Sequence, residues 1–203
     1  MRTLLVGFAS ALLLVGCAAG AARMSKVDAL MHAYDGAVPG ASVLVVRDGV
    51  PIVRRGYGFA DLEAHRAATP RTNYRLASVT KQFTAACILL LAGDGRLGLD
   101  DRVRHWLPGL PAAADTITIR HLLTHTGGLI DYEDIMPPGR TTQLRDADVL
   151  HLLESQDRLY FAPGSRYRYS NGGYALPALI VEKASGESFQ AFLRQRIFVP
   201  LGM

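Results

Sequence analysis

Lysine, cysteine and runs of like charge are all scarce in this sequence. Of 22 basic residues only Lys26, Lys81 and Lys183 are lysines, and the 203 residues include two cysteines. The net charge of +4 comes from arginines spread along the chain, without a basic run or a basic patch interleaved with aromatic residues. These absences argue against nucleic-acid binding. The composition, 49% hydrophobic and 20% charged with no internal repeat, is typical of one globular domain with a sizeable core.

The first residues have the pattern of an export signal. Arg2 is followed by an apolar core from Leu4 to Gly16 that is short for a membrane span, and small residues come next. Leu14-Val15-Gly16-Cys17 resembles the lipobox of bacterial lipoproteins, and this resemblance implies cleavage before Cys17 and lipid attachment to its thiol. We therefore expect residues 1–16 to be a lipoprotein-type signal peptide.

Residues 17–25 are then expected to be a tether. A simple secretory signal, cut among the small residues 19–22, is the alternative. Either signal predicts an exported protein of the bacterial cell envelope, and lipidation predicts a periplasmic or outer-membrane lipoprotein held by its N-terminal anchor. If Cys17 carries a lipid, Cys87 is the one cysteine left in the folded part and no internal disulfide can form. Cys87 lies in an apolar helical pattern, and we interpret it as a small buried hydrophobe.

The apolar periodicity predicts a mixture of strands and helices. Ala41–Arg47 and Val50–Phe59 are predicted strands, joined by the hairpin turn Asp48-Gly49. Because two strands do not form a stable sheet alone, we expect further strands. The polar stretches 61–74 and 130–145 are expected to be loops. Helices are predicted over residues 26–34, 78–91, 117–123 (with Thr118 as N-cap), 146–154, 174–184 and 188–196.

The stretch Ser78-Val79-Thr80-Lys81 begins the predicted helix over 78–91 and breaks a local rule. Ser78 and Lys81 share one face of this helix, a turn apart. A cation near a helix N-terminus opposes the macrodipole by about 0.3–1 kcal/mol, and an ordinary capping box would carry Glu or Gln there. Such a conflict is typical of a functional site, and a desolvated lysine can act as a base where arginine cannot. The alternative is that Ser78 is an N-cap and Lys81 extends to solvent.

A turn-rich segment further along the chain carries a second group of polar side chains. Tyr169 and Asn171 lie on a loop that could fold back to the start of the 78–91 helix. The positive charges of Arg166 and Arg168, together with that of Lys81 if it approaches, would lower the pKa of Tyr169 from its usual value of about 10. The alternative is that Ser170 or Asn171 caps the helix that follows.

His121 and His125 are spaced four residues apart, as two metal ligands on a helix could be. Three carboxylates follow them, at Asp131, Glu133 and Asp134. The catalytic glutamate of an H-E-x-x-H motif is absent, however, and no third ligand is indicated by spacing. We interpret the two histidines as helix-end residues near exposed carboxylates, and we expect neither a metal nor another cofactor.

Taken together, these segments resemble the serine β-lactamase and DD-peptidase-like hydrolases, nearest the branch of class C β-lactamases, esterases and D-aminopeptidases. The likeness extends from Pro39 to Met203. The matching segments are Arg75 to Thr84, Gly95 to Asp101, His121 to Leu129, Tyr169-Ser170-Asn171 and Pro200 to Met203.

The resemblance implies an α/β plus all-α fold of the β-lactamase/transpeptidase type, in which an antiparallel sheet accompanies a helical lobe and the site lies where they meet. It also implies that Ser78 attacks an ester or amide carbonyl to form an acyl-enzyme. Lys81 and Tyr169 would share the proton transfers, Asn171 would bind the substrate or hold Lys81, and the Ser78 N–H would be an oxyanion donor. The substrate would be a small molecule or peptidoglycan-like: a β-lactam, a D-amino-acid peptide or a carboxylic ester.

One motif of the family is not found in this sequence. The resemblance implies a third element, Lys-Thr-Gly or His-x-Gly, on a strand after the Tyr-x-Asn loop. His125-Thr126-Gly127 has a similar composition, but it precedes that loop and lies at a predicted helix end, so we reject it. We therefore expect residues 26–203 to be the N-terminal part of a hydrolase domain whose C-terminal strands are missing. The alternative function is a catalytically inactive fragment or a non-enzymatic binding protein of the cell envelope.

Overall fold

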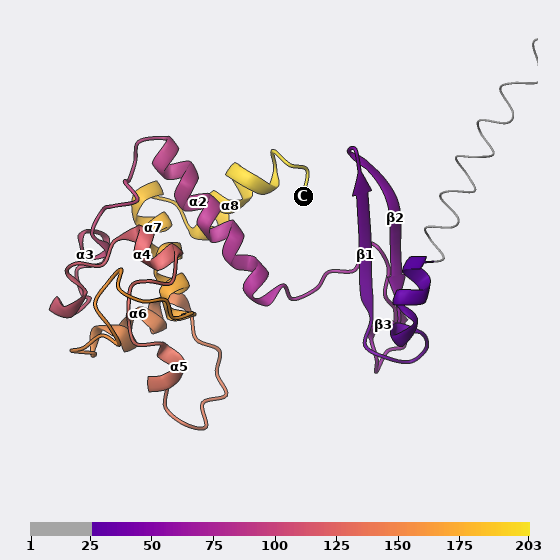
Figure 1. The fold of residues 1–203 in the computed structure, drawn as a ribbon, viewed down its shortest axis with the longest axis horizontal. Helices are drawn as coiled ribbons and strands as arrows, with labels where there is room; N and C mark the ends of the chain where they lie inside the picture. Colours follow the sequence, from indigo (N-terminus) through magenta and orange to yellow (C-terminus); the bar gives the residue numbers. More distant parts are fainter. Residues whose placement is uncertain (1–25) are drawn as a thin grey trace, which may run out of the picture. The chain divides into compact units, whose positions relative to one another are not determined.

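The computed structural model describes residues 26–203, so the predicted signal peptide, the tether and Cys17 lie outside the described residues. The chain divides into two compact units, with the boundary between Arg75 and Leu76 (Figure 1). In the part of the chain that the structure describes, no helix has both the length and the apolarity needed to cross a membrane.

The first unit is built on the predicted β-hairpin. β1 (Ala41–Arg47) pairs antiparallel with β2 (Val50–Tyr57), and the register shifts by a bulge after Val45. Asp48 and Gly49 both have positive φ, at 50° and 77°, as the tight hairpin turn requires. The turn chemistry and the β-branched residues were therefore sufficient to predict this hairpin.

A second, smaller hairpin follows and was not predicted. Gly58 has φ of 62° and separates β2 from β3 (Phe59–Asp61), so the predicted return strand ends two residues early. β3 pairs antiparallel with β4 (Arg66–Ala67), which lies in the segment predicted to be a loop. Asp61 and Arg66 form an ion pair across it at 2.5 Å. This hairpin escapes a periodicity argument because its strands are two and three residues long and carry charged residues.

The predicted helix over residues 26–34 is present in two parts. Residues 26–30 are α-helical and the 3-10 turn η1 (His32–Tyr34) follows. Asp28 connects this segment to β2, because its carboxylate accepts hydrogen bonds from Arg55 Nη1 and Tyr57 OH, both at 2.8 Å. The contact with Asp28 and burial both raise the pKa of Tyr57, with burial the larger cause.

The second unit is helical. α7 is its central element, since it packs against α2, α4, α6 and α8. The elements are η2 (Ala77–Thr80), α2 (Lys81–Gly93), α3 (Val103–Trp106), η3 (Ala112–Ala114), α4 (Ile119–Leu123), α5 (Tyr132–Ile135), α6 (Asp146–Glu154), α7 (Gly172–Ser185), α8 (Phe189–Leu193) and the π-helical turn η4 (Arg194–Phe198).

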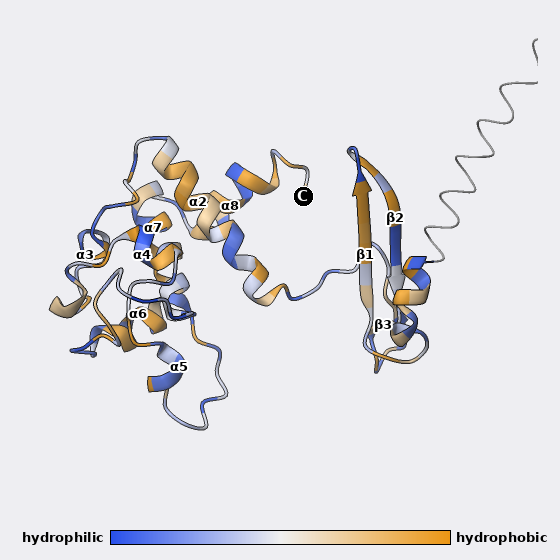
Figure 2. Cartoon of the chain, viewed as in Figure 1, coloured by the Kyte–Doolittle hydropathy of each residue, from blue (hydrophilic) through white to orange (hydrophobic). Residues whose placement is uncertain are grey.

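Apolar side chains of α2 and α7 form the centre of this unit. Ile88, Leu91, Leu176 and Ile180 are fully buried, and Figure 2 shows the apolar character of α2. Cys87 lies among them with no exposed surface, as predicted. Burial raises the pKa of its thiol to about 11, so the thiol remains neutral and acts as a small hydrophobe.

The helix boundaries differ from the predicted ones in several places, and the predicted helix over 188–196 is α8 followed by the π-helical turn η4. The predicted helix over 78–91 begins as the 3-10 turn η2, the predicted loop over 130–145 contains α5, and α7 starts two residues early, at Gly172. Glycine is a poor helix former, yet buried Asp131 accepts hydrogen bonds from the N–H groups of Asn171 and Gly172 at the start of α7. A tertiary contact therefore decides where this helix begins.

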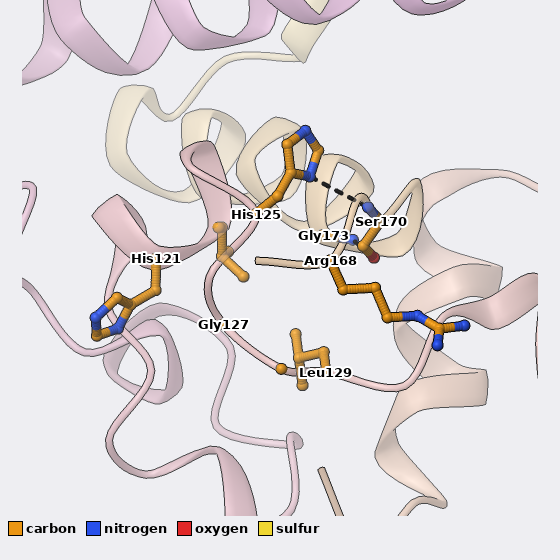
Figure 3. Close-up of a pocket in the computed structure, with 9 residues that line it drawn as sticks. His121, His125, Gly127, Leu129, Arg168, Ser170 and Gly173 are labelled. Carbon is orange, nitrogen blue, oxygen red and sulfur yellow. Dashed lines mark hydrogen bonds between the residues drawn. The ribbon is translucent and has the colours of Figure 1, made fainter. Parts of the chain in front are cut away.

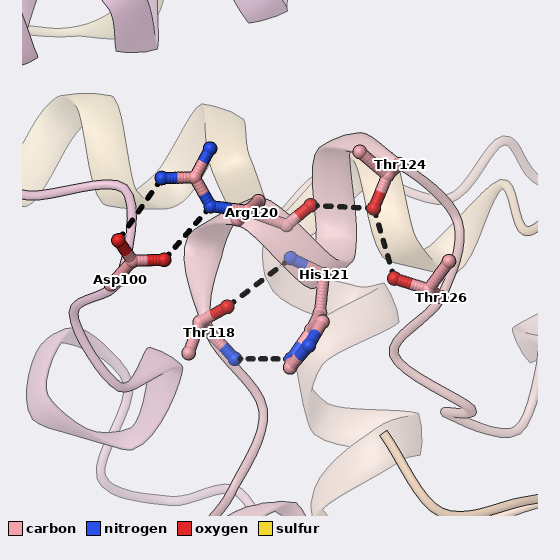
Figure 4. A network of polar contacts seen from close by, with 6 residues as sticks. All are labelled: Asp100, Thr118, Arg120, His121, Thr124 and Thr126. Atoms are coloured by element: carbon pink, nitrogen blue, oxygen red, sulfur yellow. Dashed lines mark hydrogen bonds and ion pairs between the residues drawn. The ribbon is translucent and has the colours of Figure 1, made fainter. Parts of the chain in front are cut away.

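The start of α4 is tied down by a polar network (Figure 4). As predicted, Thr118 is the N-cap: its Oγ1 accepts from the His121 N–H at 3.3 Å, and its own N–H donates to His121 Nδ1 at 3.2 Å. Arg120 binds both carboxylate oxygens of Asp100, at 2.8 and 3.0 Å. Thr124 Oγ1 donates to the Arg120 carbonyl at 2.9 Å. The network holds both ends of α4 and the turn that follows it.

Candidate active site

Ser78 and Lys81 meet where η2 leads into α2, as their spacing predicted. Lys81 Nζ donates a hydrogen bond to Ser78 Oγ at 3.1 Å. The Ser78 hydroxyl contacts side chains, and neither η2 nor α2 has a side-chain cap, so the capping alternative for Ser78 is not found. Ala77, directly before it, has φ of 46°, a left-handed conformation that is uncommon for a residue with a Cβ. Strained backbone of this kind concentrates at functional sites.

Tyr169 reaches this pair from the loop before α7. Its hydroxyl lies 2.5 Å from Ser78 Oγ, and Lys81 Nζ lies 4.7 Å from the centre of its ring. The interaction with Lys81, followed by the hydrogen bond with Ser78, lowers the pKa of Tyr169. The lowered pKa and the contribution of Lys81 were predicted, but Arg166 and Arg168 are not among the causes. Arg168 instead binds Asp134 at 2.8 Å.

Asn171 completes the cluster. Its Oδ1 accepts from Lys81 Nζ at 2.7 Å, and its Nδ2 donates to Glu133 Oε1 at 2.9 Å. Because a carboxylate can only accept a hydrogen bond from the amide nitrogen, Glu133 sets the orientation of the Asn171 amide. The N–H of Asn171 donates to Asp131 Oδ2 at 2.9 Å. The side chain of Asn171 is thus held from two sides while its oxygen faces the lysine.

Sequence reasoning missed the part that Asp131 and Glu133 play. Both were considered only as carboxylates near a doubtful metal site, whereas the structure places them against Asn171. They lie about 40 residues before the group they hold, and no local pattern distinguishes them from solvated acidic residues. Asn171 stands at the N-cap position of α7, but its side chain makes no capping hydrogen bond. The side chain that satisfies an N–H at this helix start is that of Ser170, whose Oγ accepts from the Gly173 N–H at 2.9 Å.

His121 and His125 are not brought together as ligands. His121 belongs to the α4 cap, and Figure 3 shows the two imidazoles pointing away from each other. His125 lies in the turn after α4, where Nδ1 accepts from the Ser170 N–H at 3.2 Å. Among residues 26–203, no three histidine, cysteine or acidic side chains come together as a metal site would require. His125-Thr126-Gly127 is not part of a strand, in agreement with its rejection as a third motif.

The turn after α4 and the Tyr169 loop also enclose a small cavity (Figure 3). Its volume is about 10 Å³, and its lining includes His121, His125, Leu129, Arg168 and Ser170. A cavity of this size holds at most one water molecule. It is therefore a packing feature behind the cluster and not a substrate pocket.

Comparisons with known proteins show which family the chain belongs to. The chain matches the Beta-lactamase family over residues 25–203. A penicillin-binding protein of Bacillus subtilis (strain 168) is 37% identical over 175 residues, which make up 85% of this chain and 37% of that protein. The structure of EstCE1, described as a hydrolase with promiscuous acyltransferase activity, matches with a TM-score of 0.76 at 30% identity, covering 93% of this chain and 53% of that one.

A further similar structure is the D-amino acid amidase from Ochrobactrum anthropi SV3 complexed with L-phenylalanine. It matches with a TM-score of 0.71 at 32% identity, covering 82% of this chain and 46% of that one. The chain thus spans little more than a third of the length of its curated relative, and about half of these solved chains. The α/β fold with small antiparallel sheets and a helical lobe is the fold that the resemblance implied. The chain belongs to the Beta-lactamase family, with penicillin-binding proteins and a D-amino acid amidase among its neighbours.

Proposed function

We propose that this chain carries the nucleophile and proton-transfer groups of a serine hydrolase, which cleaves an ester or amide through an acyl-enzyme on Ser78. One observation supports this most directly: Ser78 Oγ lies 2.5 Å from the Tyr169 hydroxyl and 3.1 Å from Lys81 Nζ. These are the distances at which a nucleophile can pass its proton to a base.

In the proposed reaction, Ser78 Oγ attacks the carbonyl carbon while its proton moves to the Lys81–Tyr169 pair. The tetrahedral intermediate then breaks its bond to the leaving oxygen or nitrogen, which takes a proton from the same pair. A water molecule then attacks the carbonyl of the acyl-enzyme and passes its proton to the same pair. The bond to Ser78 Oγ breaks, Ser78 takes back a proton, and the acid product is released. The lowered pKa of Tyr169 supports a phenolate as proton acceptor. Since Lys81 and Tyr169 interact directly, the role of proton acceptor need not belong to one of the two residues alone.

Asn171 is proposed to hold Lys81 in place. Its 2.7 Å hydrogen bond from Lys81 Nζ, supported by Glu133 and Asp131, leaves the amine directed toward Ser78 and Tyr169. The same amide edge can contact a substrate. No metal or other cofactor is required for this chemistry.

The substrate is proposed to be a small molecule or a peptidoglycan-like group with a β-lactam, a D-amino-acid amide or an ester at its reacting carbonyl. The family membership and the names of the similar proteins, a penicillin-binding protein and a D-amino acid amidase, support this range.

Labelling with activity probes tests the proposal. The full chain is treated with a fluorophosphonate and, separately, with a fluorescent penicillin, and the adduct is mapped by mass spectrometry. We expect an adduct on Ser78, none in Ser78→Ala, and unchanged labelling in Ser155→Ala, a serine whose hydroxyl bonds only its own helix end and a neighbouring glutamine. Modification at another residue would overturn the assignment. Folded protein without any adduct would instead favour a non-enzymatic envelope protein.

We also propose that residues 1–16 direct export and that Cys17 is lipidated, which would place the protein in the cell envelope at the membrane. The Leu14-Val15-Gly16-Cys17 sequence supports this. Metabolic labelling with an alkyne fatty acid is expected to mark the wild type and not Cys17→Ser. An unlabelled mature protein that begins at residue 22 or 23, after Ala-Gly-Ala or Gly-Ala-Ala, would show simple secretion instead.

A further inference from the structure

His125 holds the chain on both sides of Tyr169. Its carbonyl accepts from the Arg168 N–H at 3.0 Å, and its ring Nδ1 accepts from the Ser170 N–H at 3.2 Å (Figure 3). Between these two bonds, its ring lies on the ring of Tyr169, with centroids 4.6 Å apart and an interplanar angle of 33°. One residue therefore sets the backbone before Tyr169, the backbone after it and the plane of its ring.

Two more tyrosines enclose the same imidazole. The ring of Tyr174, from α7, lies 5.0 Å from it, and the ring of Tyr167 lies 5.9 Å away, nearly perpendicular. The Tyr174 hydroxyl donates to the Leu123 carbonyl at 3.0 Å, which ties α7 to α4 beside His125. Aromatic pairs at such separations stabilise by about 0.5–1.5 kcal/mol each. Tyr169 is consequently one member of an aromatic group centred on His125, in which Tyr167 is the more exposed.

The backbone at His125 has φ of 57°, in the left-handed region. Histidine is, with asparagine and aspartate, one of the residues with a side chain that adopt this region more often than others. This conformation forms part of the turn after α4, and the imidazole of the same residue contacts Tyr169 and Ser170.

We propose that His125 is a positioning residue: as a neutral imidazole it holds Tyr169 against Ser78 and Lys81, and protonation of the imidazole releases Tyr169. The effect on rate rests on the proposed function, whereas the effect on the position of Tyr169 does not.

The hydrogen bonding shows why only the neutral ring can do this. Nδ1 accepts from the Ser170 N–H, so the ring proton of the neutral imidazole lies on Nε2. If a second proton were bound at Nδ1, this atom would become a donor facing the Ser170 N–H, which is also a donor. The hydrogen bond between Ser170 and His125 would then be lost. The second proton would also add a positive charge to an aromatic group that Lys81 already contacts through the rings of Tyr169 and Tyr174.

The groups around His125 favour the neutral form. Burial is the largest cause that lowers the pKa of His125, and the charge of Lys81 lowers it further, while Asp131 opposes them. The titratable or charged groups that face the ring are Lys81 from α2, Asp131 from the segment before α5, Tyr174 from α7, and Tyr167 and Tyr169 from the loop before α7.

The first test needs no activity. In the wild-type chain, nitrogen-15 NMR of the imidazoles is expected to show the Nε2–H tautomer for His125, with a titration midpoint below the usual value of about 6.5. The carbon-13 signal of the Tyr169 ring, which is absent in Tyr169→Phe, is expected to shift with the same midpoint. An Nδ1–H tautomer of His125 would overturn the proposal. A Tyr169 signal that does not change as His125 titrates would also overturn it.

The second test uses a matched set of variants. His125→Asn keeps an acceptor near Nδ1 and suits a positive φ but cannot titrate in this range. His125→Phe keeps a ring and loses the acceptor. His121→Asn is the control, because it changes a histidine of the α4 cap four residues earlier. Thermal unfolding of each variant establishes that it is folded at the assay temperature.

The rate constant for fluorophosphonate labelling of Ser78 is then measured from pH 5 to 9. We expect the wild type and His121→Asn to lose rate below the His125 midpoint, and His125→Asn to lack this acid step. His125→Phe is expected to react about 10²-fold more slowly throughout, the loss typical of a misplaced catalytic group. The same acid step in His125→Asn would overturn the proposal. If Ser78 is never labelled while Tyr169 still follows His125 in the NMR titration, the proposed function fails and the positioning role stands.

Discussion

The two units of the chain use apolar residues in different ways. In the helical unit, Ile88 and Ile180 have no exposed surface. In the hairpin unit, Leu44 of β1 is 61% exposed and Val50 of β2 is 60% exposed, although β1 is as apolar as α2 (Figure 2). An apolar sequence therefore does not by itself identify a core. The two units differ in the number of elements that pack around the apolar residues: α7 packs against five helices, α2, α3, α4, α6 and α8, whereas β1 pairs only with β2 among the described strands.

The candidate active site lies entirely in the helical unit. Ser78, Lys81, Tyr169 and Asn171 all belong to the helical unit, and so do Asp131, Glu133 and His125, which hold them. Chemistry that depends on distances of 2.5 to 3.1 Å needs supports that do not move, and the well-packed unit provides them. The comparison predicts that substitutions of similar size should have very different effects in the two units.

The largest effect is expected at the amine of the site. Lys81→Met keeps the length and packing of the side chain but removes the charge and the proton carrier. We expect labelling of Ser78 by a fluorophosphonate to fall by about 10²–10⁴, the contribution typical of general acid–base catalysis. Lys183→Met, at an exposed position of α7, is the control and should react like the wild type. Equal rates for Lys81→Met and the wild type would remove Lys81 from the mechanism.

The next prediction compares the loss of stability caused by truncating an apolar side chain in each of the two units. Ile180→Ala leaves a cavity under α7 and is expected to lower the free energy of unfolding by about 2–5 kcal/mol. Leu44→Ala, on an exposed strand position, is expected to change it by less than about 0.5 kcal/mol. Urea unfolding followed by circular dichroism measures both. A large loss of unfolding free energy in Leu44→Ala would contradict this prediction, because it would mean that this face of β1 is buried in solution.

A smaller effect is expected at the start of α4. Thr118→Ala removes the side-chain cap that accepts from the His121 N–H, and should lower the free energy of unfolding by about 1 kcal/mol. Thr118→Ser retains the hydroxyl and serves as the matched control. If both variants unfold alike, the loss comes from the missing methyl group and not from the cap.

The smallest effect is a pH dependence of stability. The folded state lowers the pKa of His125, so the unfolded state takes up the proton first as the pH falls. The free energy of unfolding is therefore highest above about pH 6.5 and declines below it, until the pH passes the folded pKa. The difference in stability between the wild type and His125→Asn, measured by urea unfolding from pH 8 to 5, should change in this interval. A difference that does not vary with pH would contradict the lowered pKa.

The sequence was informative wherever the cause is local. The Asp48-Gly49 turn and the alternating strand residues predicted the first hairpin, and α6 was predicted with the bounds it has, Asp146–Glu154. Ser78 and Lys81 meet because residues three apart share a helix face. The family resemblance indicated Tyr169 and Asn171, and the structure brings both to this pair.

The sequence was least informative where a local structure depends on a residue far away in the chain. α7 begins at Gly172 because Asp131 accepts its first N–H groups, and no helix propensity favours two glycines there. The β3–β4 hairpin has strands of three and two residues, joined by the turn over residues 62–65 and by one ion pair, and so carries no apolar alternation to detect.

The sequence by itself determined the hairpin, most of the helices, the apolar faces of α2 and α7, and the closeness of Ser78 to Lys81. Each of these depends on residues within one turn or one strand pair, where spacing translates directly into geometry. Only the tertiary structure decided that His125 holds Tyr169, that Glu133 orients Asn171, and that Ile88 and Leu91 of α2 are buried while Leu44 and Val46 of β1 are exposed. These features depend on which elements pack together, and periodicity along one segment carries no information about its neighbours.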